Sequence, residues 1–551
     1  MTAAIPSDKP ASLADVESAK LASRQLGLEF DSLDAVNPDP DWLGRFPVRL
    51  LMDYEILPLR QSDGRVRVAV ANPDAAAPAL QRLRVLTGLH FLPVLAPREA
   101  LQRELKRRLG VGADTLQSLE SADDFQWVRE ESDERADLEQ AAGDASIIRF
   151  VNQVLADAIS LRATDIHIEP FEEELRIRYR IDGVLQEAPV PPRLNRFQPA
   201  IVSRIKILSG LNIAEKRLPQ DGRIRVRVRG GELDVRISII PMLHGEAVVL
   251  RLLRRDAQLM RLGDLGLSPR DRATLDRLLA IPHGIVLLTG PTGSGKTTTL
   301  YSALNEINDV GRKIVTIEDP VEYQLRGVNQ IQVNEKAGLT FARGLRSILR
   351  HDPDVVLVGE IRDPETAAIA VQASLTGHLV FSTLHTNDAP GAPVRLIDMG
   401  IEPYLVASSL EAAIAQRLVR LLCVQCRRPD DSERADTLRE QFPELRGAPL
   451  YRAEGCAECR HTGYFGRRAI FEAMPLTPSL RRLILRNAPS GEIREQARRE
   501  GMVSLLEDGW RLVREGVTTP DEVLRVSKDE RMNELGAVEN EPAPLAERAT
   551  P

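Results

Sequence analysis

Apolar and polar residues alternate along the chain in a way that predicts several α/β domains. Apolar residues recur at helical spacing in 13–26 and 98–109, and residues 66–70 alternate like a strand. We therefore expect a small N-terminal α/β domain over residues 1–112. Acidic residues then replace apolar ones, which predicts a flexible acidic linker over residues 113–145.

Residues 146–256 are predicted to form a second, smaller α/β domain. A helix is expected from Ile147 to Ala163, followed by strands at 175–181, 223–229 and 233–239. In the first two strands arginines alternate with apolar residues, so the arginines would share one face. We interpret that face as a solvated sheet surface, a nucleic-acid patch or an anion-facing subunit interface. The residues alone favour the solvated surface.

After residue 257 short apolar strands alternate with helical segments, which predicts a doubly wound parallel sheet. The strands are expected at Ile285–Thr289, Ile314–Ile317, Val355–Val358 and Leu379–Thr383. The helices are expected at Thr297–Asn308, Phe341–Leu349, Pro364–Thr376 and Pro403–Leu421. The domains predicted for this part are a nucleotide core over 257–420, a cysteine module over 421–470, a C-terminal helical region over 471–535 and a disordered tail over 536–551.

Composition narrows the classes of function. The 551 residues carry a net charge of −7 with a pI near 5.8, which argues against bulk nucleic-acid binding. The N-terminus is polar, so no secretory signal is expected. No apolar run is long enough to span a bilayer. We expect a protein that is cytoplasmic or peripheral to a membrane.

The segment Gly290–Thr297, GPTGSGKT, fits the phosphate-loop pattern G-x-x-x-x-G-K-[ST] in full, between an apolar strand and a predicted helix. Its glycines let backbone N–H groups point into one concavity, to which the helix N-terminus adds positive charge. Lys296 is expected to reach the β- and γ-phosphates and Thr297 to hold Mg²⁺. The residues predicted to bind ATP here are Gly290, Pro291, Thr292, Gly293, Ser294, Gly295, Lys296, Thr297 and Thr298.

Carboxylates follow two of the predicted core strands. One of Glu318, Asp319 and Glu322 is expected to polarise the water that attacks the γ-phosphate. The next strand ends in Glu360, where phosphate-loop ATPases usually have an aspartate, and Glu360 is expected to hold Mg²⁺ through water. The alternative for the first segment is an acidic loop that caps the next element, and for Glu360 it is a surface carboxylate at the end of a strand.

Histidines and arginines complete the candidates in the nucleotide core. His378 and His385 bracket a strand, and a histidine beside a phosphate loop can report hydrolysis to the rest of the fold. Arg346 and Arg350 lie four residues apart on a predicted helix and face one way. They form either a solvated stripe or a pair of guanidinium groups presented to phosphate.

The four cysteines form two C-x-x-C pairs, Cys423/Cys426 and Cys456/Cys459. The two pairs together can bind one tetrahedral metal ion, each pair from a tight turn, which predicts a closed, structural zinc site. His461 is a spare candidate ligand, and redox activity is the disfavoured alternative.

Together these motifs resemble those of a known family, the secretion ATPases of type II secretion and type IV pilus assembly systems. The resemblance covers about residues 145–530. The segments that carry it are the phosphate loop, Ile317–Glu322, Val358–Asp363, Gly377–Thr386, Lys216–Arg223 and the tetracysteine module, which the long assembly-type members carry and the short pilus-retraction members lack.

The resemblance implies a RecA-like phosphate-loop ATPase core with a smaller α/β, PAS-like domain before it, an N-terminal α/β docking domain and a zinc module. It implies a homo-hexameric ring with ATP bound between the small domain and the core. The roles that it implies are the catalytic glutamate Glu322, the magnesium-linked Glu360, the phosphate-sensing His378 and His385, and the phosphate-facing arginines Arg223, Arg236, Arg346 and Arg350.

By the same resemblance, the ring would hydrolyse ATP in the cytoplasm to power pseudopilus assembly and protein export in a type II secretion system. Residues 1–112 would dock on the cytoplasmic domain of a bitopic partner at the inner-membrane platform, with anionic lipid as a further candidate partner. A type IV pilus assembly ATPase is the nearest alternative. Three other functions are disfavoured. A nucleic-acid or conjugation motor is disfavoured because aromatic residues are sparse, and a non-catalytic scaffold because the catalytic motifs are intact. A cyclic-dinucleotide site in the first domain is disfavoured because no repeated glycine/arginine–leucine motif is evident.

Overall fold

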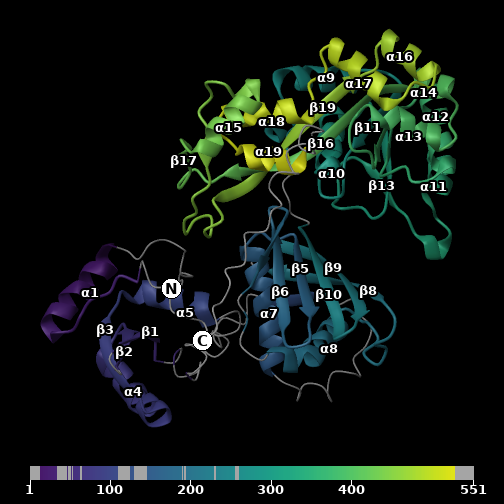
Figure 1. The fold of residues 1–551 in the computed structure, drawn as a ribbon. Coiled ribbons are helices and arrows are strands. Elements are labelled where there is room, and N and C mark those ends of the chain that lie inside the picture. Colours follow the sequence, from purple (N-terminus) through teal and green to yellow (C-terminus); the bar gives the residue numbers. More distant parts are fainter. Residues whose placement is uncertain are drawn as a thin grey trace, which may run out of the picture. The chain divides into compact units, whose positions relative to one another are not determined.

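The structure is a computed structural model. The chain forms two compact units, with the boundary between Asp256 and Ala257 (Figure 1). Each unit has its own hydrophobic cores. The predicted tail and most of the predicted acidic linker lie outside the described residues. The structure describes residues 13–33, 46, 51, 54–62, 65–109, 125–128, 145–188, 190, 194–228, 231–254 and 260–527.

The first sheet of the N-terminal unit has three strands in the order β1-β2-β3. β1 and β2 are antiparallel, whereas β2 and β3 are parallel and joined through a helix, α4. The Asn72 side chain accepts hydrogen bonds from two N–H groups at the start of α4, and Gly88 ends the helix with a positive φ. The elements are α1 (Leu13–Leu26), β1 (Ile56–Ser62), β2 (Arg65–Val70), α4 (Pro73–Thr87), β3 (His90–Leu95) and α5 (Arg98–Leu109), which confirms the helices and strand expected here.

The second sheet of this unit has seven strands, all antiparallel, in the order β4-β8-β9-β10-β5-β6-β7. Alternate strand positions share one core with the helices α7 and α8. β4 is formed by residues that were predicted as linker, and it pairs with β8 at the sheet edge. The elements are β4 (Phe125–Val128), α7 (Ala145–Ser160), β5 (Asp165–Pro170), β6 (Leu175–Ile181), β7 (Val184–Glu187), α8 (Gln198–Leu208), β8 (Gln220–Val228), β9 (Gly231–Met242) and β10 (Gly245–Arg254).

The arginines of this sheet lie on the face opposite that core. Arg223, Arg236 and Arg251 stand side by side in register on three neighbouring strands. Acidic residues lie among them: Arg223 pairs with the buried Asp234, and Arg251 pairs with Asp165 at 3.0 Å. The face is therefore a mixed, ion-paired surface.

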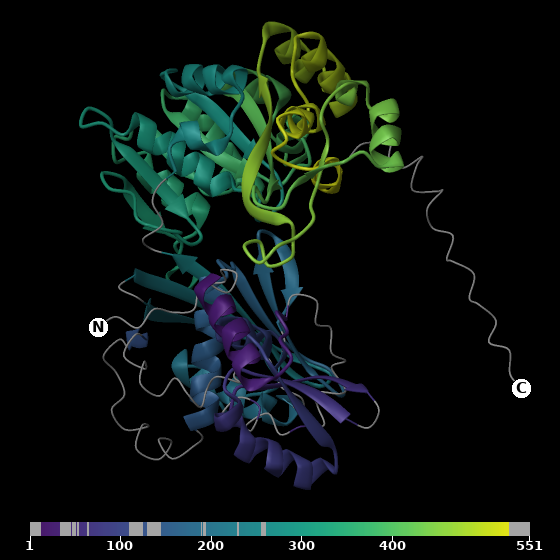
Figure 2. The ribbon, with the colours of Figure 1, turned by 90° about the vertical axis from the view of Figure 1, so that its left-hand side faces the viewer.

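The second unit is built on a seven-stranded sheet in the order β13-β12-β14-β15-β11-β16-β19. All neighbours are parallel except β19, which runs antiparallel to β16 at one edge. The strands are β11 (Gly284–Thr289), β12 (Ile314–Glu318), β13 (Asn329–Gln332), β14 (Val355–Val358), β15 (Leu379–Leu384), β16 (Leu410–Leu422) and β19 (Tyr464–Pro475), the last drawn in yellow-green in Figure 2.

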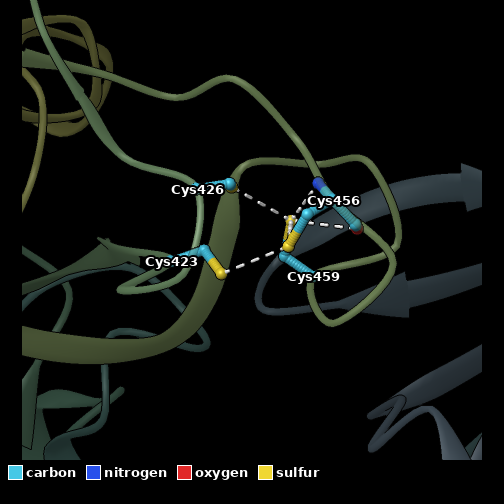
Figure 3. A group of neighbouring side chains, drawn as sticks. All are labelled: Cys423, Cys426, Cys456 and Cys459. Carbon is cyan, nitrogen blue, oxygen red and sulfur yellow. Dashed lines mark hydrogen bonds between the residues drawn. The ribbon is translucent and has the colours of Figure 1, made fainter. Parts of the chain in front are cut away.

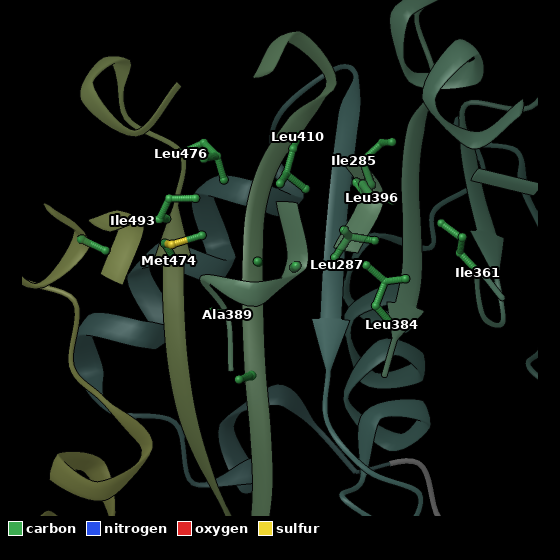
Figure 4. Packing of buried hydrophobic residues seen from close by; sticks show 14 of the residues in the cluster. Ile285, Leu287, Ile361, Leu384, Ala389, Leu396, Leu410, Met474, Leu476 and Ile493 are labelled. Carbon is green, nitrogen blue, oxygen red and sulfur yellow. The ribbon is translucent and has the colours of Figure 1, made fainter. Parts of the chain in front are cut away.

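Helices cover both faces of this sheet. Ile285 and Leu287 of β11 belong to one core, which includes the helices from α11 to α14 and those of the C-terminus (Figure 4). Val286 and Leu288 belong to the other core, with α9 and α10. Such burial on both faces is typical of doubly wound parallel sheets. The helices are α9 (Pro269–Leu279), α10 (Lys296–Ile307), α11 (Phe341–Ile348), α12 (Pro364–Leu375), α13 (Gly391–Asp398), α14 (Pro403–Ser409), α16 (Pro478–Leu485), α17 (Ser490–Arg499), α18 (Leu505–Arg514) and α19 (Pro520–Val526).

One expected core element is wrong. The helix predicted over Pro403–Leu421 ends at Ser409, and residues 410–422 form the strand β16. β16 lies between β11 and β19, and nearly all of its residues are buried or half-buried. Pairing on both sides thus overrides the helix propensity of its alanines and leucines. As a result, the core sheet extends past residue 420, and the cysteine module is inserted between β16 and β19.

Candidate nucleotide site and metal centre

The phosphate loop lies at the carboxyl end of β11 and leads directly into α10. Gly290, Gly293 and Gly295 all have positive φ values, of 144°, 81° and 88°. Space is limited as well, because a Cβ on Gly290 would lie 2.7 Å from the Gln416 carbonyl oxygen. Glycine is therefore required here by both conformation and packing.

Polar groups in the loop are arranged to receive an anion. The Lys296 ammonium group donates to the carbonyl oxygens of Gly290 at 2.8 Å and Pro291 at 3.0 Å. The Ser294 hydroxyl is buried and has no hydrogen-bond partner among the described residues. A phosphate in the loop would give both groups an anionic partner, so the donors present fit a nucleotide polyphosphate.

The electrostatics of Lys296 support this fit. Burial is the main cause that lowers the pKa of the Lys296 ammonium group to about 8; the Glu360 carboxylate opposes this shift and the Arg417 charge adds to it. An anion in the loop would favour the charged lysine, so phosphate binding and lysine protonation support each other.

The remaining loop residues lie around this centre. Pro291, Thr292 and Gly293 are exposed, whereas Thr297 and Thr298 are half-buried on the first turn of α10. Thr297 is placed where a phosphate-loop fold supplies a hydroxyl to Mg²⁺, which makes it the residue that would hold this ion.

Three carboxylates follow β12, and their surroundings differ. Glu318 is buried at 4 % exposure and accepts hydrogen bonds from the hydroxyls of Thr316 and Tyr301. Asp319 is exposed, and Glu322 is half-buried. Glu318 is thus held within the fold, and Glu322 is the better candidate for the residue that activates water.

Glu360 and His385 come together at the carboxyl edge of the sheet. Glu360 follows β14, and one of its oxygens lies 3.3 Å from His385 Nε2, while the other lies 2.6 Å from Arg362 Nη2. Leu384, the residue before His385, stands opposite Thr289, the residue before the phosphate loop. Both side chains are therefore at the same edge of the sheet as Lys296.

His378 lies at the amino ends of the strands, on the opposite side of the sheet from Lys296, so within one chain the structure does not bring it to the phosphate loop. It precedes Leu379, which stands opposite Gly284 at the start of β11. Its Nδ1 lies 2.9 Å from the Ala373 carbonyl oxygen near the end of α12. A six-residue strand separates its two ends by roughly 20 Å.

The predicted arginines have other partners. Arg346 pairs with Glu365 at 2.6 Å, and Arg350 Nη1 donates to the Arg346 carbonyl oxygen at 2.8 Å. Arg223 and Arg236 belong to the N-terminal unit, on the ion-paired sheet face described above.

Sequence reasoning missed Gln416, which fixes the loop from β16. Its amide donates to the Ser294 carbonyl oxygen at 2.9 Å and accepts from the Thr299 hydroxyl at 2.8 Å. The sequence pattern predicts a helix for the segment that contains Gln416, and a helix there gives no reason to place Gln416 beside the phosphate loop. A correct strand next to β11 would have been the signal.

The four cysteines converge between β16 and β19 (Figure 3). Their sulfurs lie within 4.8 Å of one another, with separations of 3.8 Å for Cys423–Cys456 and 3.7 Å for Cys426–Cys459. A tetrahedral site with Zn–S bonds of about 2.3 Å places its sulfurs about 3.8 Å apart, whereas a disulfide needs about 2.05 Å. The spacing fits a four-thiolate metal site, and His461 is not part of the cluster.

Backbone donors favour the thiolate form of Cys459, whereas burial raises the pKa of the Cys423 and Cys426 thiols. The N–H groups of Cys456 and Gly463 donate to Cys459 Sγ at 3.1 Å and 3.2 Å. Burial opposes ionisation, but these donors and the neighbouring thiols outweigh it and lower the pKa of the Cys459 thiol to about 7. A metal ion would find one ligand close to its binding form at neutral pH.

Fold and site together define a phosphate-loop nucleotide-binding protein with a RecA-like core. The fold resembles the X-ray structure of the Legionella pneumophila ATPase DotB, with a TM-score of 0.51 at 22% identity over 70% of this chain and 95% of that one. The family described as "Type II/IV secretion system protein" matches residues 140–525, and an MshEN domain matches residues 26–114. The chain belongs to the type II/IV secretion system protein family.

Curated relatives agree with this assignment. The chain is 53% identical to Type II secretion system protein E of Pseudomonas aeruginosa, over 72% of this chain and 78% of that protein. It is 45% identical to the protein of the same name from Xanthomonas campestris, over 92% and 88%. It is 41% identical to the Type IV pilus assembly ATPase PilB of Myxococcus xanthus, over 92% and 91%. No helix among the described residues is long and apolar enough to cross a membrane.

Proposed function

We propose that this chain hydrolyses ATP to ADP and phosphate and uses the reaction to drive pseudopilus assembly and protein export in a type II secretion system. The observation that carries the proposal is the phosphate loop. The Lys296 ammonium group and the buried Ser294 hydroxyl are placed to donate to a bound anion. Glu360 and His385 lie at the same edge of the sheet. The names of the relatives supply the secretion system.

The proposed mechanism assigns one task to each group. Main-chain N–H groups of the loop and Lys296 hold the β- and γ-phosphates and stabilise charge that develops during transfer. Thr297 and, through water, Glu360 would hold Mg²⁺, which would neutralise charge on the same phosphates. Glu322 accepts a proton from the attacking water at its carboxylate. His385 responds to loss of the γ-phosphate, because its ring already contacts Glu360.

We propose that the working form is a homo-hexamer in the cytoplasm, peripheral to the inner membrane. Arg223, Arg236, Arg346 and Arg350 would contribute charge to phosphates across a domain or subunit boundary. Residues 1–112 would bind the cytoplasmic domain of a membrane partner, with anionic lipid as an additional contact. Zinc would occupy the four-cysteine site as a structural ion.

A second function, type IV pilus assembly, is favoured by the similarity to PilB, which spans nearly the whole of both chains. Replacing the chromosomal gene with one that encodes Lys296→Ala separates the two. Loss of exported proteins from the culture medium with pili retained supports type II secretion. Loss of surface pili with normal export contradicts it and supports pilus assembly.

A further inference from the structure

A buried arginine lies directly behind the phosphate loop. Arg417 of β16 is 9 % exposed. Within the described part of the chain no carboxylate lies within ion-pair distance of it, although the charges of Glu472 and Asp388 partly offset the effect of burial, which lowers its pKa. Its guanidinium group donates to two main-chain carbonyl oxygens. Nη1 donates to Gln416 at 2.9 Å, and Nη2 donates to Asn387 at 2.6 Å. A buried cation of this kind costs free energy unless an anion compensates it.

On one side Arg417 touches the phosphate loop. A Cβ on Gly290 would lie 2.8 Å from Arg417 Nη1, so the guanidinium group packs against the first residue of the loop. Its neighbour Gln416 hydrogen-bonds to the Ser294 carbonyl oxygen and to Thr299 in α10. Together the two residues contact the beginning and the middle of the loop and the first turn of the helix that follows it.

On its other side Arg417 touches the segment 385–390, which follows β15 and begins with His385. Two contacts join this segment to later elements. Asp388 pairs with Arg494 of α17 at 2.5 Å, and the Ala389 N–H donates to Glu472 of β19 at 2.8 Å. The segment therefore has His385 beside Glu360 at one end and is anchored to the C-terminal elements at the other.

We propose that Arg417 is a positioning residue that joins the phosphate loop to the His385 segment, so that nucleotide in the loop orders both together. The planar guanidinium fork suits this role because it donates in two directions at once. A lysine at this position would keep the charge, but it has no planar fork with which to bond the Gln416 and Asn387 carbonyl oxygens while it packs against Gly290. The inference rests on the proposed ATPase function.

The test compares Arg417→Lys and Arg417→Met in the full-length protein by kcat and KM for ATP. We expect Arg417→Lys to lower kcat about tenfold with KM within about threefold of wild type, and Arg417→Met to raise KM about tenfold as well. Arg511→Met is the matched control. Arg511 is a partly buried arginine of α18 that pairs with Asp508 at 2.8 Å. Its loss should lower the melting temperature and leave the kinetics of the folded protein unchanged.

A measurement without turnover separates this inference from the proposed function. Hydrogen exchange of residues 385–390 is compared with and without a slowly hydrolysed ATP analogue. We expect protection on binding in wild type and Arg511→Met, and its loss in both Arg417 variants. Nucleotide-induced protection that persists in Arg417→Met, or wild-type kinetics in Arg417→Lys, would overturn the inference. Absence of turnover in the wild type would overturn the proposed function alone.

Discussion

At the scale of single residues, surroundings separate carboxylates that the sequence leaves equivalent. Glu318 and Glu322 both follow β12, but Glu318 is closed in by Thr316, Tyr301 and Gln330. A carboxylate committed to several internal donors has little freedom to meet a water molecule. Glu322 is half-buried at the same end of the strand and is less enclosed than Glu318.

We therefore predict that Glu322→Gln lowers kcat about 100-fold or more while nucleotide affinity is retained, because the amide binds water but accepts no proton. Glu318→Gln is the matched control. It should destabilise the fold by about 1–3 kcal/mol through its buried partners and leave kcat of the folded protein nearly unchanged. Steady-state kinetics and denaturant unfolding measure the two effects. If Glu318→Gln loses turnover and Glu322→Gln does not, the assignment is reversed.

The histidines show what sequence proximity conceals. His378 and His385 lie seven residues apart and bracket the same strand, so both were expected beside phosphate. Parallel strands have all their carboxyl ends at one edge, however, and the strand itself carries His378 to the opposite edge. Because His385 follows the carboxyl end of β15, the strand direction alone places it near the phosphate loop. His378 precedes the same strand, so both histidines could contact one ligand within a single chain only if the two ends of β15 lay together.

At the scale of elements, the sequence predicts structure that depends on neighbouring residues but not strands that depend on pairing with distant parts of the chain. The phosphate loop, β11 and α10 were predictable because strand, glycines and helix are contiguous in the sequence. The strand β16 was not, because LEAAIAQRLVRLL consists largely of good helix formers. Its conformation is imposed by β11 and by β19, whose Phe471 stands opposite Gln416 some 55 residues earlier in the sequence.

The four-cysteine module allows a direct test of the proposed zinc site. We predict that Cys459→Ser lowers the bound zinc from about one ion per chain to near zero, because a closed site needs all four thiolates. Metal analysis of the purified protein measures this. Thr462→Ser, which keeps the hydroxyl that donates to the Cys459 carbonyl oxygen, is the control and should retain the metal. Full zinc content in Cys459→Ser would contradict a four-thiolate site.

At the scale of the whole molecule, the cysteine module and the C-terminal helices belong to the nucleotide unit. β19 continues the core sheet to Pro475, and residues of α16, α17, α18 and α19 share a core with β11 and β15. The sequence showed the order of these parts, but their junctions depend on pairing between distant strands. This arrangement gives a structural path from the phosphate loop, through β16, to the C-terminal elements.

The central claim is that the phosphate loop of this chain supports ATP hydrolysis. Its most direct test is release of inorganic phosphate from ATP by the purified, assembled full-length protein, with and without Mg²⁺, beside Lys296→Ala. We predict Mg²⁺-dependent release by the wild type and loss of at least about 100-fold in the variant. Equal release by both proteins, or none from the wild type, would contradict the claim.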